Sequence, residues 1–196
     1  MLSIHRIIRM EPISYTRRRK RMIHSYKGII PQIHQTAYIA HDATLTGDIE
    51  IGEKSSVWFK TVIRGDIAPT KIGKRVNIQD LSLIHQSPGL PVTVEDDVSV
   101  GHQVTLHACT IRKNALIGMG TIVLDKAEIG ENAFIGAGSL VTPGTKIPAN
   151  TLALGRPAKV VRDLTEEDYK EMKRIRESYV ERAAAYKKES SLNTLF

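Results

Sequence analysis

Three histidines in the middle of the chain, His85, His102 and His107, are the residues whose type and spacing suggest metal chemistry. Imidazole is the commonest metal ligand in proteins, and three imidazoles leave one coordination position open for solvent or substrate. A single outward histidine is more often an ordinary polar residue. The relative placement of the three therefore decides whether they form a site, and that placement depends on the elements that carry them.

Hydrophobic residues recur at every sixth position through this part of the chain. The first unbroken series is Ile33, Ile39, Leu45, Ile51, Val57 and Ile63. Neither the helical period nor the strand period predicts this spacing. A short fixed repeat of this kind is typical of a hexapeptide β-helix, in which three repeats form one triangular coil. We therefore expect a mainly β protein, a left-handed parallel β-helix.

Two insertions and one deletion interrupt the repeat. The insertions cover residues 66–70 and 86–91, and the deletion lies between Leu106 and Ile111. Positions must therefore be counted in repeats rather than residues. On that count Ile63, Ile84 and Leu106 are three repeats apart and share one face of successive coils. The residues that directly follow them, Arg64, His85 and His107, should form one column, and Asp80 should stack with His102 on the preceding face.

This arrangement predicts a metal site shared between subunits. Neighbouring coils lie about 4.8 Å apart, so the side chains of His85 and His107 can converge on one ion. His102 belongs to the adjacent face, from which outward side chains diverge. We therefore predict a homotrimer with interfacial metal sites, each using His85 and His107 from one chain and His102 from the next.

The bulk composition narrows the classes of partner. The chain has 196 residues, which suits one domain with a sizeable core. Its net charge of +7 arises mostly in residues 1–21, which carry seven Lys or Arg against one Glu, and the remainder is nearly neutral. This argues against nucleic-acid binding by the body of the protein. No apolar run is long enough to cross a bilayer, so we expect no membrane partner. A single cysteine, Cys109, fits a cytoplasmic protein.

Three segments are expected along the chain. Residues 1–21 form a basic tail, either a disordered arm or a stretch upstream of a translation start at Met22, which we favour. Residues 22–160 form the hexapeptide-repeat domain. Residues 161–196 form a C-terminal α-helix with a loose end, capped by Thr165 and carrying a tyrosine-rich stripe that we interpret as packing. Trp58 points outward and is a candidate trimer contact.

The motifs around the histidines resemble those of the gamma-class carbonic anhydrase family, especially its short cytoplasmic bacterial branch. The resemblance runs from about Tyr26 to the end of the helix. The matching runs are Arg64-Gly65-Asp66, Arg75-Val76-Asn77-Ile78-Gln79-Asp80, His85, and His102-Gln103-Val104-Thr105-Leu106-His107. The resemblance implies that His85, His102 and His107 bind Zn²⁺, or Fe²⁺ without air, across a trimer interface. It assigns Arg64, Asp66 and Asp80 to inter-subunit ion pairing and bicarbonate binding, and Asn77 and Gln79 to the surroundings of the solvent on the metal.

The activity that the resemblance implies is a lyase reaction, the reversible hydration of CO₂ to bicarbonate by hydroxide on the metal. Gln79 could orient that solvent. Arg64 could hold Asp80 across the interface or steady bicarbonate, and plain interface salt bridging explains these polar residues equally well. One departure from the family matters: segment 86–91 has no carboxylate to export protons, so CO₂ hydration is expected to be weak.

Two other functions fit the same repeat. One is acyl transfer or thioester hydrolysis, with coenzyme A lying between subunits and a single histidine as general base. That function needs no metal. The other is a non-catalytic assembly subunit, in which a metal only ties the trimer together.

Overall fold

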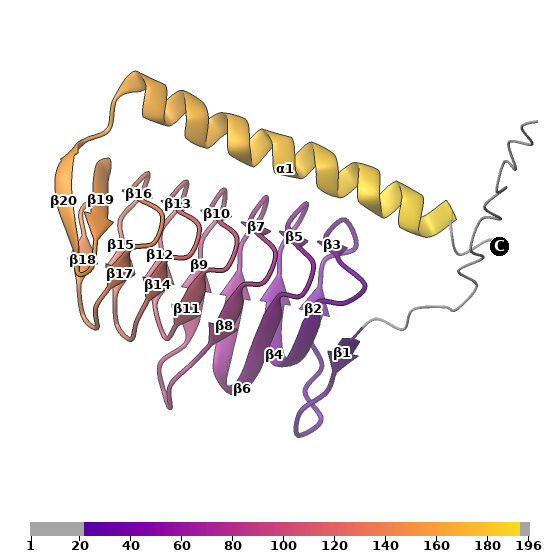
Figure 1. Cartoon of the computed structure of the whole chain (residues 1–196). Coiled ribbons are helices and arrows are strands. Elements are labelled where there is room, and N and C mark those ends of the chain that lie inside the picture. The colour runs from indigo at the N-terminus through magenta and orange to yellow at the C-terminus, as the bar shows by residue number, and fades with distance from the viewer. Residues whose placement is uncertain (1–21, 193–196) are drawn as a thin grey trace, which may run out of the picture.

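The computed structural model describes residues 22–192, which form a parallel β-helix with one long α-helix lying along it (Figure 1). The predicted fold class is thereby confirmed. The basic tail expected over residues 1–21 lies outside the described residues. In the described part of the chain, no helix combines the length and the apolar character needed to cross a bilayer.

Twenty strands build the solenoid. They are β1 (Met22–His24), β2 (Gln32–Ile33), β3 (Tyr38–Ile39), β4 (Thr44–Ile51), β5 (Ser56–Val57), β6 (Val62–Ile72), β7 (Asn77–Ile78), β8 (Leu83–His85), β9 (Val92–Val94), β10 (Ser99–Val100), β11 (Thr105–His107), β12 (Thr110–Ile111), β13 (Leu116–Ile117), β14 (Ile122–Val123), β15 (Glu128–Ile129), β16 (Phe134–Ile135), β17 (Leu140–Val141), β18 (Lys146–Ile147), β19 (Thr151–Gly155) and β20 (Ala158–Asp163). The named strands pair in parallel, except for the antiparallel pair β19 and β20.

The strand order defines three faces of the prism. The helix face consists of β3, β5, β7, β10, β13, β16 and β19. The histidine face consists of β1, β8, β11, β14 and β17 with the first halves of β4 and β6, and the polar face consists of β2, β9, β12, β15 and β18 with the second halves of β4 and β6. Because β4 and β6 each contribute to two faces, the two faces belong to one sheet.

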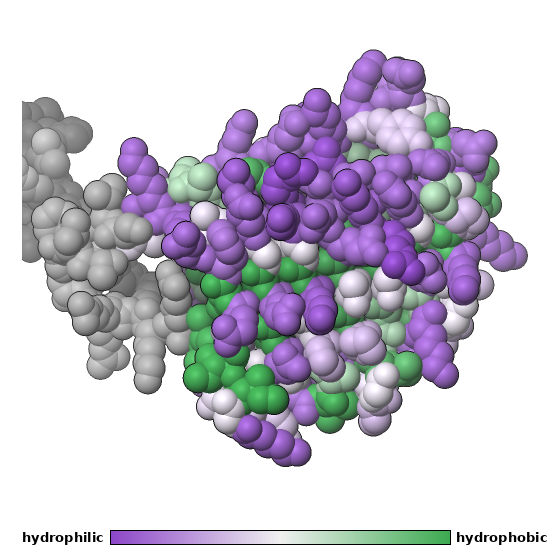
Figure 2. Space-filling model, turned by 180° about the vertical axis from the view of Figure 1, so that it is seen from behind, coloured by the Kyte–Doolittle hydropathy of each residue, from purple (hydrophilic) through white to green (hydrophobic). Residues whose placement is uncertain are grey.

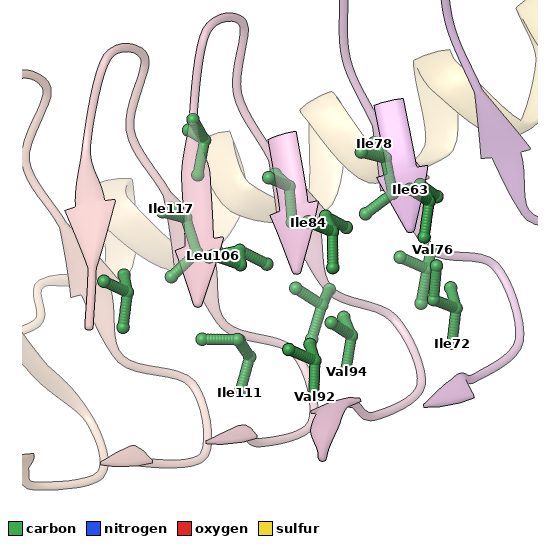
Figure 3. Close-up of a cluster of buried hydrophobic side chains, with 14 of the residues drawn as sticks. Ile63, Ile72, Val76, Ile78, Ile84, Val92, Val94, Leu106, Ile111 and Ile117 are labelled. Atoms are coloured by element: carbon green, nitrogen blue, oxygen red, sulfur yellow. The ribbon is translucent and has the colours of Figure 1, made fainter. Parts of the chain in front are cut away.

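The core is a stack of aliphatic side chains inside the prism, as the six-residue repeat predicts. On the histidine face, Ile63 pairs with Ile84, Ile84 with Leu106 and Leu106 with Val123, and all four are fully buried. Figure 3 shows side chains of neighbouring coils pointing toward one another in the interior. Full burial of such a side chain contributes about 1.5–3 kcal/mol, so the repeated column fixes the register of each coil.

Helix α1 (Glu166–Leu192) covers the helix face, where it contacts β3, β5, β7 and β10. It begins as predicted, because Thr165 Oγ1 accepts a hydrogen bond from the Asp168 backbone N–H and the Asp168 carboxylate accepts one from the Thr165 backbone N–H. Trp58 is not a free outward aromatic residue. It is 4% exposed and packs edge-on against Tyr179 and Tyr186 of α1. The tyrosine stripe therefore packs on the prism, as expected.

The outer surfaces of the other two faces differ in polarity. The outward column of the polar face is Glu50, Lys71, Thr93, Thr110, Glu128 and Lys146. The matching column of the histidine face is Val62, Leu83, Thr105, Ile122 and Leu140. In Figure 2 hydrophilic residues gather along the top of the molecule, where α1 lies, and a hydrophobic band runs below them. The histidine face thus carries an apolar column that α1 does not cover.

Candidate metal centre

His85 and His107 lie side by side on paired strands. His85 ends β8, His107 ends β11, and the two residues are direct partners in the parallel register. Their rings have centroids 5.3 Å apart, and Nδ1 of His85 lies 3.2 Å from Nε2 of His107. The predicted column of histidines is therefore present, and it arises because one coil separates the two residues.

The 3.2 Å separation suits two ligands of one ion. Zinc binds imidazole nitrogen at about 2.0–2.1 Å, so two nitrogens in a tetrahedral site are about 3.3 Å apart. The two rings need only a small adjustment to reach that spacing. Both are partly buried, with side chains 17% and 32% exposed for His85 and His107, so their orientation is restricted by the surrounding coil.

Two carboxylates select the tautomers of these rings. Asp125 Oδ1 lies 2.6 Å from Nδ1 of His107, and Asp66 Oδ1 lies 3.2 Å from Nε2 of His85. A carboxylate accepts, so in a neutral ring the proton is placed on the nitrogen beside the carboxylate. The two nitrogens that face each other then both present lone pairs. Lone pairs at this distance repel unless a cation lies between them, so the donor set fits a divalent metal.

The Arg64-Gly65-Asp66 run places its charged residues through a close approach of two backbones. A Cβ at Gly65 would lie 2.3 Å from the carbonyl oxygen of Asp48, so a side chain has no room there. Arg64 Nη1 donates to Asp66 Oδ2 at 3.1 Å in the same chain. Asp66 therefore joins Arg64 to His85, and the Arg64 side chain remains 49% exposed.

His102 stacks with Asp80, as the repeat count predicts. Its Nδ1 lies 2.9 Å from Asp80 Oδ2, and the other oxygen of Asp80 accepts the Phe59 backbone N–H at 3.2 Å. The remaining ring nitrogen, Nε2, lies 3.5 Å from the Tyr179 hydroxyl. Burial, followed by the charge of Asp80, raises the pKa of Tyr179, so this hydroxyl keeps its proton at neutral pH. The third histidine is thus also held by a carboxylate.

The described part of one chain does not complete a metal site. Among residues 22–192, no three His, Cys, Asp or Glu side chains converge closely enough to hold an ion. An ion bound by His85 and His107 would need a further donor from outside these residues. Arg64 and Asp80 are likewise not joined within the chain, because Arg64 pairs with Asp66 and Asp80 pairs with His102.

Asn77 and Gln79 lie on the His102 side of the candidate site. Both are buried, and they form a short chain in which Gln79 donates to Asn77 and Asn77 donates to Ser99. Asn77 is thus engaged with protein groups through both ends of its amide. Gln79 directly precedes Asp80 and turns its amide nitrogen to Asn77, so its oxygen is the end left for another partner.

The sequence reasoning missed Asp125, Ser87 and the contact of Tyr179. Leu106 pairs with Val123, so extending the histidine column by one coil points to Leu124, and Asp125 is one residue further along the turn. Ser87 Oγ donates to Asp125 Oδ2 at 2.5 Å. The hydrogen bonds from Ser87 and then His107 hold the pKa of Asp125 below its usual value. No signal in the sequence marks the approach of Tyr179, because it depends on the path of α1.

The chain matches one family and several named proteins. Residues 108–143 match the family described as bacterial transferase hexapeptide (six repeats). Over 85% of its length the chain is 68% identical to a carbonic anhydrase of Geobacillus kaustophilus, covering 91% of that protein. It is 35% identical to mitochondrial gamma carbonic anhydrase 2 of Arabidopsis thaliana, over 82% of the chain and 60% of that longer protein.

A solved structure points to the same architecture under a different description. It comes from Bacillus cereus and is described as a presumed acetyltransferase, with 62% identity, a TM-score of 0.85, and coverage of 86% of this chain and 98% of that one. The solved structure agrees with the fold, and the identity with named carbonic anhydrases identifies the family. The chain belongs to the gamma-class carbonic anhydrase family of hexapeptide-repeat proteins.

Proposed function

We propose that this protein hydrates CO₂ reversibly to bicarbonate at metal sites shared between the subunits of a homotrimer. The observation that carries the proposal is the 3.2 Å approach of Nδ1 of His85 to Nε2 of His107, with a carboxylate beside the other nitrogen of each ring. Such a pair favours a cation. The relatives named as carbonic anhydrases support the choice of reaction.

The third ligand in this proposal is His102 of a neighbouring subunit. His102 has its Nδ1 bound to Asp80, so its Nε2 is the nitrogen available for a metal. The apolar column of the histidine face supports the trimer, because Leu83 is 43% exposed in the single chain and packing against a second copy would remove it from water. Burial of that column would bring the histidine face of one subunit against the His102 edge of the next.

Zn²⁺, or Fe²⁺ in its place, is the cofactor in this proposal, and zinc supplies hydroxide at neutral pH because coordination lowers the pKa of water to about 7. The neutral rings of His85, His102 and His107 leave the charge of the ion undiminished. Through its free oxygen, Gln79 can accept a hydrogen bond from the solvent on its side of the site. Arg64, which is half exposed, can bind a bicarbonate oxygen or pair with Asp80 of a neighbour.

Proton export is the weak step of this design. The segment 86–91 beside the site carries no carboxylate. Asp125 is close by, but both of its oxygens are already engaged by Ser87 and His107. The proposed enzyme therefore relies on dissolved buffer to remove protons, and its turnover should be low.

Metal analysis coupled to a CO₂ hydration assay tests the proposal. The wild type, purified with and without air, should contain about one ion per subunit and hydrate CO₂. His107→Ala should lose both the ion and the activity, whereas His34→Ala, which changes an exposed histidine just after β2, should lose neither. A wild type that carries no metal under either condition would contradict the proposed site.

Acyl transfer or thioester hydrolysis is the second candidate, favoured by the acetyltransferase description of the Bacillus cereus structure. It predicts tight binding of coenzyme A that survives removal of metal. An enzyme that only hydrates CO₂ should not bind coenzyme A tightly, so calorimetry with coenzyme A distinguishes the two candidate functions.

A metal-tied assembly protein without catalysis is the third candidate. It predicts that chelation dissociates the trimer and that hydration is absent even from protein with full metal content. Measuring both properties on one preparation distinguishes this candidate from a slow enzyme, whose hydration rate would rise with metal content.

A further inference from the structure

The Asp125 carboxylate bridges two groups beside the candidate metal centre. One oxygen accepts from Nδ1 of His107 at 2.6 Å, and the other accepts from Ser87 Oγ at 2.5 Å. Asp125 comes from the turn after β14, one coil beyond His107, while Ser87 follows β8 on the other side. Three successive coils are therefore joined through one side chain.

The bridge is poorly explained by stability alone. The side chains of His107 and Asp125 are each about one third exposed, at 32% and 33%. Exposed ion pairs contribute little to folding because water competes for both partners. The contact nevertheless has two short hydrogen bonds, which is the geometry expected where orientation matters.

Ser87 is itself fixed by its loop. The Leu90 backbone N–H donates to the Ser87 carbonyl at 2.9 Å, which closes a tight turn. The preceding residue, Gln86, is 1% exposed and its amide bonds the Thr70 hydroxyl inside the prism. The start of insertion 86–91 is thus held in place, and the insertion brings the Ser87 hydroxyl to Oδ2 of Asp125, the oxygen that His107 does not contact.

We propose that Asp125, held by Ser87, is a positioning residue that fixes the tautomer and ring orientation of His107 for metal binding. The inference rests on the proposed metal function but adds residues to which nothing assigns a role. A carboxylate on the far nitrogen of a ligating histidine keeps the near nitrogen unprotonated and raises its basicity, and loss of such a partner typically weakens metal affinity by about 10–100-fold. Insertion 86–91 therefore serves the ligand rather than proton export.

The test uses two measurements on the full-length protein. The first is nitrogen NMR of histidine-labelled, metal-free protein, which reports which ring nitrogen of His107 carries the proton. The second is the Zn²⁺ dissociation constant from competition with a chelator. Variants are Asp125→Ala, Asp125→Asn and Ser87→Ala. The matched control is Asp163→Asn, which changes an exposed carboxylate of β20.

In the wild type, His107 should carry its proton on Nδ1. Asp125→Ala should shift the proton toward Nε2 and weaken zinc binding about 10–100-fold. Asp125→Asn keeps an acceptor, so it should retain the His107 tautomer and lose less zinc affinity. The zinc affinity of Ser87→Ala should lie between those of Asp125→Asn and the wild type. The control should match the wild type in both measurements.

Two results would overturn the inference. One is an unchanged His107 tautomer together with unchanged zinc affinity in Asp125→Ala. The other is a lower unfolding temperature of metal-free Asp125→Ala with wild-type zinc affinity, which would show a purely structural role. If the wild type binds no zinc, the proposed function fails, whereas the tautomer measurement still decides the role of Asp125.

Discussion

The Nδ1 atom of His102 lies 2.9 Å from Oδ2 of Asp80, so the third histidine is held by a carboxylate just as His85 and His107 are. In each case the carboxylate takes one ring nitrogen and leaves the other as a lone pair. Ordinary surface histidines have no reason to share this arrangement. His85 turns Nε2 to its carboxylate, whereas His102 and His107 turn Nδ1, so the shared feature is the carboxylate partner and not the ring orientation.

Mixed trimers provide a quantitative test of site sharing. Subunits carrying His102→Ala or His85→Ala should each bind no metal alone. In a cyclic trimer formed at random from equal amounts, a site is restored wherever an intact His85 faces an intact His102, which gives about one quarter of all sites. Metal content after mixing and refolding measures this fraction.

The control for mixed trimers uses two defects on the same side of the site. A mixture of His85→Ala and His107→Ala subunits never places both intact residues in one chain, so it should recover no metal. Sharing between subunits is refuted if this control recovers as much metal as the first mixture, or if the first mixture recovers none.

A charge in the apolar column of the histidine face should prevent trimer formation. Leu83→Glu would place a carboxylate where the proposed interface excludes water, and an unpaired buried charge is costly. Sedimentation should show a smaller species that has lost its metal. Thr93→Glu, which changes the outward column of the polar face in the same coil, should leave the trimer intact. A Leu83→Glu protein that still sediments as a trimer would locate the interface elsewhere.

The sequence predicts the prism and its two columns well because each coil repeats the same geometry. Once inward residues such as Ile63 and Ile84 are recognised, the residue after each of them must point outward on the same face. The pairing of His85 with His107 follows from this counting, including the correction for segment 86–91. The spacing of the inward residues therefore predicts which residues of successive coils are neighbours.

The sequence does not predict what packs across the faces. Trp58 is a candidate trimer contact from the sequence, but in the structure α1 packs over it, because the spacing of apolar residues in a helix does not specify which face of the prism the helix covers. The same packing brings Tyr179 to His102. The resemblance places Asn77 near the solvent on the metal, which stays a prediction, and no periodicity signals that both ends of its amide bond Ser99 and Gln79.

The start of α1 should be sensitive to acid. Hydrogen bonds from Arg162 and then from the Thr165 backbone lower the pKa of Asp168 well below its ordinary value of 3.8. A lowered folded-state pKa means that the stabilisation is complete above pH 3.8 and is lost as the pH falls below it. Asp168→Asn should therefore reduce the free energy of unfolding by about 0.5–2 kcal/mol at pH 7, the range for helix caps.

Denaturant unfolding of Asp168→Asn and wild type at one protein concentration measures this difference. The gap between the two proteins should narrow as the pH is lowered from 4 toward 2. Glu167→Gln, which changes an exposed carboxylate of the same helical turn, serves as the control. A gap that stays constant across this range would show that the Asp168 charge does not support the helix.

The lack of a carboxylate in segment 86–91 predicts a hydration rate limited by buffer. Raising the concentration of a small imidazole buffer should increase turnover in the wild type, because each cycle must pass one proton to solvent. Pro88 lies exposed in the same segment, next to Ser87, so Pro88→Glu should raise the rate at low buffer and reduce its dependence on buffer. Pro88→Gln also replaces the proline with a side chain of the same size but adds no carboxylate to take up protons, so its hydration rate should match that of the wild type.

Stopped-flow hydration assays across buffer concentrations compare the three proteins. A wild-type rate that is independent of buffer would mean that another group exports the proton, and a rate increase shared by Pro88→Gln would trace the gain to the loop rather than to the carboxylate.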